Sequence, residues 1–85
     1  METTEKAKAF NTSVYKQIDY LKTTEYKNAV IVSNKVLARL LDVDEQTIIN
    51  WRDAGWIRGQ LIAPRVWRYK MPEVIADIEK YRKVY

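Results

Sequence analysis

The sequence predicts a small, mostly α-helical domain with a β-wing of two or three strands and an extra N-terminal helix. Three observations lead to this fold class. Apolar residues recur at helical spacing within residues 10–21, 36–41 and 74–81. A short turn at Asp42 joins the second of these segments to another amphipathic segment. After Gly55 the apolar pattern changes to a period of two, which is typical of strands.

The N-terminal part is predicted to be an arm on the main domain. In a chain of 85 residues we expect a helical arm and connector over residues 1–28 and one small domain over residues 29–85. The arm should be helical from about Thr4 to Lys22, with a restart near residues 11–13. Packing on the chain's own domain is the simplest use of its apolar stripe, while pairing as a homodimer or binding a recombinase remains open. The stripe consists of Phe10, Val14, Ile18 and Leu21.

The first helix of the main domain is expected to begin after Ser33. The Ser33 hydroxyl can accept a hydrogen bond from the free amides of the first helical turn. Asp42 stands where this helix must end, and Asp tolerates a left-handed backbone better than most residues do. The side of this helix predicted to be buried carries Val36, Leu37, Leu40 and Leu41.

A second helix is expected to follow almost at once. Val43 should fill the angle between the two helices, and Asp44 should cap the second one. Ile48 and Trp51 lie three residues apart and should face the core, and Gly55 should end the helix. Two short helices joined in this way are typical of a helix-turn-helix, whose second helix enters the DNA major groove.

The wing is predicted as two strands, residues 60–63 and 66–70, with Pro64 and Arg65 at the bend, and the second strand alternates between apolar and basic residues. On the second of these, Trp67 and Tyr69 should face inward. Residues 30–32 are β-branched or apolar, and form either a strand that joins the wing or extended chain that fills the core. A last helix should follow, with an apolar face made of Val74, Ile75, Ile78 and Tyr81.

Taken together, residues 31–81 resemble the excisionase-type and MerR-type winged helix-turn-helix domains. The chain differs from the usual pattern of that family at Asp42, where Gly is expected, and at Arg58, where Pro often stands. Glu45 and Asp53 are acidic where basic residues are common. The matching positions are Leu40-Leu41-Asp42-Val43, Asp44, Thr47-Ile48, Trp51, Gly55-Trp56-Ile57, Val66-Trp67-Arg68-Tyr69 and Val74 to Ile78.

The positive charge of the chain is concentrated in one segment. The formal net charge is +4, and the acidic and basic residues of positions 1–26 cancel. Clustered cations beside a candidate DNA-binding helix suit a polyanion, although a solvated basic loop would give the same pattern. The excess arises between residues 52 and 70, from Arg52, Arg58, Arg65, Arg68 and Lys70 against Asp53.

Candidate DNA contacts follow from these patterns. The helix over residues 45–54 should present a polar face to base edges, because Asn and Gln can pair with adenine and an apolar side chain can touch a thymine methyl. Glu45 could accept from a cytosine amino group. An ordinary solvated helix face is the alternative. The expected base contacts are Gln46, Thr47, Ile49 and Asn50, and the expected phosphate contacts are Lys35, Arg52, Arg58, Arg65, Arg68 and Lys70.

Other classes of function have little support in the sequence. The chain has no His and no Cys, its two glycines form no phosphate loop, and its carboxylates are dispersed. We therefore expect no enzyme, no metal site and no cofactor. No apolar run is long enough to span a membrane, and residues 1–5 do not begin a signal peptide, so we expect a cytoplasmic protein.

The function expected from the resemblance is that of a DNA-binding accessory protein of excisionase type from a phage or mobile element. Such a protein would bind duplex DNA with the helix at 45–54 and the wing at 60–70, in DNA recombination. A minimal transcription regulator is the close alternative. The chain ends soon after the last helix, which favours these over full MerR-type regulators. A protein-interaction module on a winged-helix scaffold, without DNA binding, also remains open because Glu45 and Asp53 are acidic.

Overall fold

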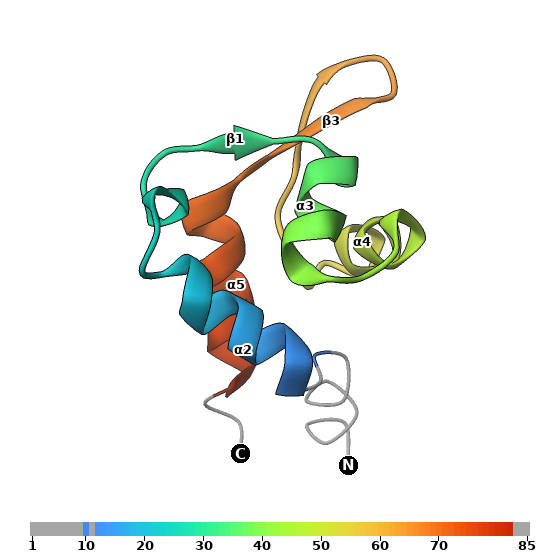
Figure 1. Cartoon of the computed structure of the whole chain (residues 1–85). Coiled ribbons are helices and arrows are strands. Elements are labelled where there is room, and N and C mark those ends of the chain that lie inside the picture. Colours follow the sequence, from blue (N-terminus) through green and yellow to red (C-terminus); the bar gives the residue numbers. More distant parts are fainter. Residues whose placement is uncertain (1–9, 11, 83–85) are drawn as a thin grey trace.

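The computed structural model describes Phe10 and residues 12–82. This part of the chain is mostly helical with a small antiparallel sheet, which confirms the coarse fold class (Figure 1). The elements in chain order are α2 (Thr12–Leu21), the 3-10 helix η1 (Glu25–Lys27), β1 (Ile31–Val32), α3 (Asn34–Leu41), α4 (Glu45–Asp53), β2 (Gln60–Ala63), β3 (Val66–Lys70) and α5 (Met71–Arg82).

Among the described residues, three strands form the sheet in the order β1-β3-β2. β1 pairs with β3 and places Val32 opposite Tyr69, so the segment at 30–32 does supply a strand beside the hairpin. The β2–β3 pairing is irregular between Leu61 and Ala63. At the hairpin bend Arg65 has a φ of 64°. Figure 1 shows that the β2–β3 hairpin projects from the body of the molecule, past the short strand β1.

Helices α3 and α4 are joined by the predicted tight turn. The Ser33 hydroxyl accepts from the Val36 amide at 3.3 Å, and Asp42 adopts the left-handed conformation with φ 58° and ψ 48°. Asp44 has the extended backbone of an N-cap, but its carboxylate accepts no capping hydrogen bond in the described part of the chain. Gly55, with φ 81°, follows α4 as predicted. The prediction that Val36 is buried was wrong: it is 39% exposed, because it lies on the outer side of α3.

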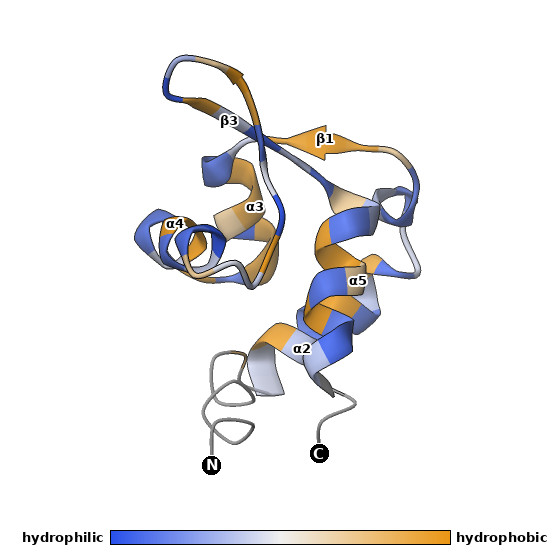
Figure 2. Ribbon diagram, turned by 180° about the vertical axis from the view of Figure 1, so that it is seen from behind, coloured by the Kyte–Doolittle hydropathy of each residue, from blue (hydrophilic) through white to orange (hydrophobic). Residues whose placement is uncertain are grey.

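The apolar core lies between α2, α3, α4 and α5, which are below the sheet in Figure 2, and it includes Val32 and Tyr69 of the sheet. The Phe10 ring lies edge-on to Trp51 at 4.8 Å and tilted against Tyr81 at 5.3 Å, measured between ring centroids. The ammonium group of Lys22 donates to Glu79 at 2.9 Å and ties the end of α2 to α5. The N-terminal stripe is fully buried in this core, through Phe10, Val14, Ile18 and Leu21.

This burial decides among the three uses left open for the stripe. Since Phe10, Val14, Ile18 and Leu21 pack on the chain's own helices, they offer no surface to a second copy or to a recombinase, and the partner role assigned to them is corrected. The predicted boundary at residue 28 falls between η1 and β1. The predicted helix from Thr4 to residue 9 lies outside the described residues, and α2 begins at Thr12, near the expected restart.

Candidate nucleic-acid interface

Helix α4 has one buried and one exposed side. Ile48 and Trp51 point into the core, as predicted. Glu45, Gln46 and Asn50 are exposed. The other two expected base contacts, Thr47 and Ile49, are half-buried. The exposed side of α4 is therefore mainly polar and carries the amide side chains that were expected to meet base edges.

The two amides on this side are coupled to each other. Gln46 Nε2 donates to Asn50 Oδ1 at 3.0 Å, across one turn of the helix. This bond uses one N–H of Gln46 and one lone pair of Asn50. The Asn50 amide nitrogen and the Gln46 carbonyl oxygen are not used in this bond, so the exposed pair can still offer one donor and one acceptor. Adenine presents the complementary pair, N7 and N6–H, in the major groove.

A hollow of about 300 Å³ lies where α3, α4 and the hairpin meet. The N-terminal end of α3 borders the hollow, and the positive end of the helix dipole favours an anion there. Three cations and one carboxylate are found among the described residues that line the hollow, which are Ser33, Asn34, Lys35, Glu45, Arg65, Val66, Trp67 and Arg68. Sequence reasoning had picked Lys35, Arg65 and Arg68 but missed Ser33 and Asn34, although a capping Ser before Asn-Lys marks a helix start.

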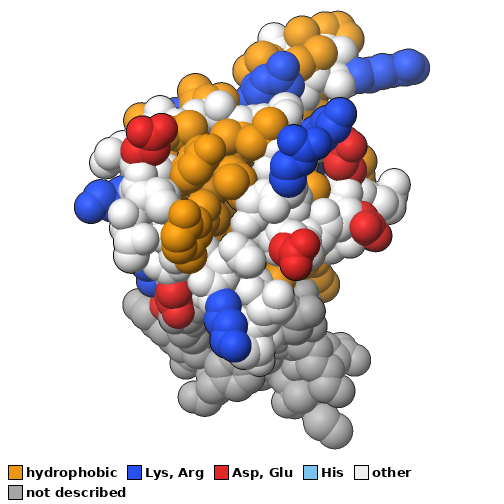
Figure 3. All heavy atoms as spheres, viewed as in Figure 1, with side chains coloured by type: hydrophobic (Ala, Val, Ile, Leu, Met, Phe, Trp, Pro, Cys, Tyr) orange, Lys and Arg blue, Asp and Glu red, His pale blue; other side chains and the backbone are white. Residues whose placement is uncertain are grey.

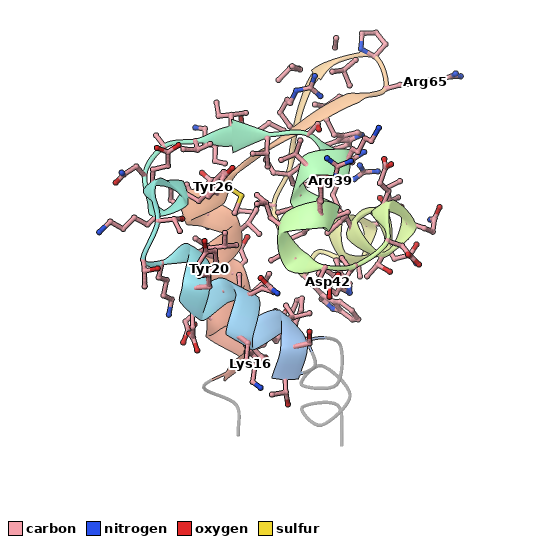
Figure 4. All side chains as sticks on the ribbon, viewed as in Figure 1. Lys16, Tyr20, Tyr26, Arg39, Asp42 and Arg65 are labelled. Carbon is pink, nitrogen blue, oxygen red and sulfur yellow. The ribbon has the colours of Figure 1, made fainter. Side chains whose placement is uncertain are left out.

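The three cations of the hairpin differ in how exposed they are. The Arg65 side chain extends away from the body of the molecule at the hairpin tip (Figure 4). Arg68 is half-buried, and its Nη1 donates to the Trp67 carbonyl oxygen at 2.8 Å. Lys70 is half-buried at the end of β3, opposite Ile31. The most accessible of these three charges is thus at the hairpin tip, and the other two lie close to the sheet.

Arg52, an expected phosphate contact, is turned inward instead. Its guanidinium lies over the Trp67 ring, 4.0 Å from the centroid, and its Nη1 donates to the Tyr69 hydroxyl at 3.3 Å. Nη2 donates to Asp53 at 3.2 Å. Only 13% of the Arg52 side chain is exposed. It joins α4 to β3, a role that the charge pattern alone did not indicate.

The lack of a side chain at Gly59 allows the backbone to lie close to the Arg52–Trp67 contact. A Cβ added at Gly59 would lie 2.9 Å from Tyr69 Cε2, 3.1 Å from Trp67 Cε3 and 3.3 Å from Arg52 Cδ. The chain can therefore pass over the Arg52–Trp67 contact only because residue 59 has no side chain.

Arg58, another expected phosphate contact, is paired with α5. Asp77 is buried, and its Oδ2 accepts from the Arg58 amide and from Arg58 Nε, both at 3.0 Å. This hydrogen bond and the Asp77 charge raise the pKa of Arg58. Arg58 is not among the residues that line the hollow. Sequence reasoning missed Asp77, which lies 19 positions away in the chain.

The hollow over the turn between α3 and α4 has a slight excess of negative charge. An open hollow of about 440 Å³ lies over it, lined by Lys35, Ala38, Arg39, Asp42, Val43, Asp44 and Glu45. Arg39 and Asp42 project from this side in Figure 4. Its three carboxylates outnumber its two cations, whereas cations outnumber the carboxylate in the hollow beside the hairpin, so an anionic partner is better accommodated between α4 and the hairpin.

No protein-family model, no curated protein and no solved structure matches this chain. Within Phe10 and residues 12–82, no group of three or more His, Cys, Asp or Glu side chains is arranged to hold a metal ion. The helices in the same part of the chain are too short or too polar to cross a membrane.

Proposed function

We propose that this protein binds duplex DNA with a sequence preference, in the manner of a winged helix-turn-helix domain. The observation that carries the proposal is the cationic hollow beside the amide side chains of α4. Lys35, Arg65 and Arg68 supply charge for phosphates, and Gln46 and Asn50 supply hydrogen-bonding groups for base edges. Thr47 and Ile49 lie beside the amides on α4 and complete the base-facing set.

The dimensions of α4 suit this role. Its nine residues span about 13 Å along the helix axis, and the major groove of B-DNA is wide enough to admit a helix. With α4 in the major groove, the hairpin meets the neighbouring backbone and the adjacent minor groove. Lys70 then adds to the phosphate contacts, whereas Arg52 and Arg58 hold the protein together rather than the DNA.

The resemblance to excisionase-type domains extends this proposal to a biological role. An accessory protein of DNA recombination from a phage or mobile element, acting in the cytoplasm, fits a small chain with one DNA-binding face. A minimal transcription regulator would use the same face. In both roles Glu45 meets a cytosine amino group or stays at the groove margin.

Charge reversal at two places tests the proposal. The variant Lys35→Glu with Arg68→Glu places carboxylates in the hollow. The control Lys16→Glu makes the same type of change on α2, far from the hairpin (Figure 4). Binding of a labelled duplex at low salt should be abolished by the first variant and only slightly weakened by the control. Absence of binding by the unmodified chain, or equal loss per charge in both variants, would contradict the proposal.

A protein-interaction module is the second candidate, and one observation favours it. Exposed apolar side chains gather on the face that carries α2, β1 and α3 (Figure 3). On these elements Tyr20 is 64% exposed, Ile31 56% and Val36 39%. This face adjoins the cationic hollow at the start of α3, which lines both. Under this alternative, Tyr20→Ser with Ile31→Ser would abolish binding of the protein partner. The variant Lys35→Glu with Arg68→Glu would leave that binding unchanged.

A further inference from the structure

The strand β2 is uncharged, apolar apart from Gln60, and open to solvent. All four of its residues, Gln60–Ala63, are exposed, with Leu61 at 57% and Ile62 at 60%. Pro64 at the bend is exposed as well. In Figure 2 this strand of the projecting hairpin is coloured as hydrophobic, at the edge of the sheet that no described strand covers. Two large aliphatic side chains on a projecting strand indicate a surface that meets a partner.

The geometry of the hairpin directs these two side chains differently. Leu61 lies opposite Trp67 in the β2–β3 pairing and so shares the sheet face that carries Trp67. Ile62 lies at the irregularity between Leu61 and Ala63, where the strand has an extra residue without a cross-strand partner. The irregular strand is short and is followed by Pro64. These features oppose the addition of a further strand at this edge.

The positive charge around β2 favours a nucleic acid as the partner. Residues 60–70 contain Arg65, Arg68 and Lys70 and no acidic residue. Two copies of this hairpin edge would bring like charges together, whereas a nucleic acid would neutralise them. Aliphatic side chains next to arginine are also what proteins use to enter the minor groove, where the apolar groups press on a base step and arginine meets the negative potential.

We propose that Leu61 and Ile62 form an apolar wedge that enters the DNA minor groove and partly unstacks one base step, with Arg65 as its cationic guide. This inference rests on the proposed function and adds a partner surface to it. Unstacking costs free energy, so the wedge favours a step that is already weakly stacked. The protein then prefers a site with a flexible pyrimidine–purine step, or a mismatch, beneath the hairpin.

Paired duplexes test the wedge. The full chain is titrated against a duplex that carries a site selected from random DNA, and against the same duplex with a single mismatch moved along it stepwise. At one position the mismatch should tighten binding about tenfold, because the unstacking cost is reduced. The double variant Leu61→Ser with Ile62→Ser should bind the intact site and lose this preference. A 2-aminopurine at that position should brighten on binding of the unmodified chain and stay dim with the variant.

Ile31→Ser is the matched control. Ile31 is 56% exposed on β1, the other edge of the same sheet, and is outside the proposed DNA contacts. The control should keep the mismatch preference. The wedge is refuted, and DNA binding retained, if the serine double variant keeps the preference or if no mismatch position tightens binding. Conversion of a dimer to a monomer by the double variant would also refute it, in favour of a second copy. Failure of the unmodified chain to bind any duplex would instead refute the proposed function.

Discussion

The guanidinium of Arg52 lies 4.0 Å from the centroid of the Trp67 ring, so the last turn of α4 is fastened to the central strand of the sheet. Arg52 comes from the helix proposed to enter the major groove, and Trp67 from the hairpin proposed to meet the neighbouring backbone. Their contact sets the angle between these two elements. Arg52, expected from the sequence to contact a phosphate, thus holds α4 and the hairpin of the proposed DNA interface together.

Arg52→Ala should therefore lower stability and DNA affinity together. Loss of the cation–π contact alone should lower the free energy of unfolding by about 0.5–2 kcal/mol, measured by urea titration. Because Arg52 contacts no phosphate in this interpretation, the slope of log affinity against log salt should not change. Arg52→Lys keeps the charge and should recover part of both losses. A reduced salt slope in Arg52→Ala would show that its guanidinium does reach the DNA.

Two glycine substitutions should have different consequences. Gly59→Ala forces a Cβ against Tyr69 and Trp67, so it should destabilise the fold by about 1–3 kcal/mol and weaken DNA binding by shifting the hairpin. Gly55→Ala has no described atom within 4 Å of the new Cβ, and its φ of 81° adds only local strain of about 1–2 kcal/mol. Thermal unfolding should detect both changes. Only Gly59→Ala should reduce affinity at a temperature where both variants are folded.

The salt dependence of binding should reflect four phosphate contacts. Lys35, Arg65, Arg68 and Lys70 remain after Arg52 and Arg58 are assigned to internal contacts. Each contact contributes roughly −0.9 to the slope of log affinity against log salt, so the slope should be about −3.6. Fluorescence anisotropy at several salt concentrations measures it. Arg68→Ala should make the slope less steep by about one contact, and an unchanged slope would exclude Arg68 from the interface.

Asn50→Ala should separate base recognition from phosphate binding. On a selected site the loss should be about 1–3 kcal/mol, with much less loss on random DNA. Since Asn50 also accepts from Gln46, the variant should lose no more than about 0.5 kcal/mol of helix stability. Asn28→Ala, at an exposed asparagine far from α4 in the chain, is the matched control. Equal loss on both kinds of DNA would mean that α4 does not contact base edges through Asn50.

The Arg58–Asp77 pair should matter for stability and leave DNA binding unchanged. Asp77→Ala removes the acceptor for the Arg58 amide and should lower Tm by several degrees, and Asp77→Asn, which keeps an acceptor, should lower it less. Asp77 raises the pKa of Arg58 above its already strongly basic ordinary value, so the contribution of the charged guanidinium is fully present at neutral pH and is lost only in strong alkali. Arg58 should therefore cause no change of stability between about pH 6 and pH 10. A DNA affinity altered by Asp77→Ala in the folded protein would contradict the assignment.

Local chemistry was enough to predict the elements of the main domain. A serine before a helical apolar pattern, an aspartate in a left-handed turn and a glycine after α4 each act over one or two turns of chain, and Ser33, Asp42 and Gly55 adopt those roles. The strand after Pro64 follows from alternation, and the bend follows from the preset backbone angle of Pro64, both of which depend only on nearest neighbours. The face of α4 that carries Ile48 and Trp51 followed from helical spacing in the same way.

The tertiary structure decided the use of side chains that have more than one possible partner. A long cation such as Arg52 or Arg58 reaches several directions from its backbone position, and the nearest aromatic ring or carboxylate determines which one it takes. Those partners, Trp67 and Asp77, lie 15 and 19 positions away, so no local pattern could indicate them. For the stripe headed by Phe10, packing on its own domain was the simplest expectation, but its pattern alone left another chain open as a partner. The close fit of Phe10 against Trp51 and Tyr81, from three distant segments, settled its place in the core.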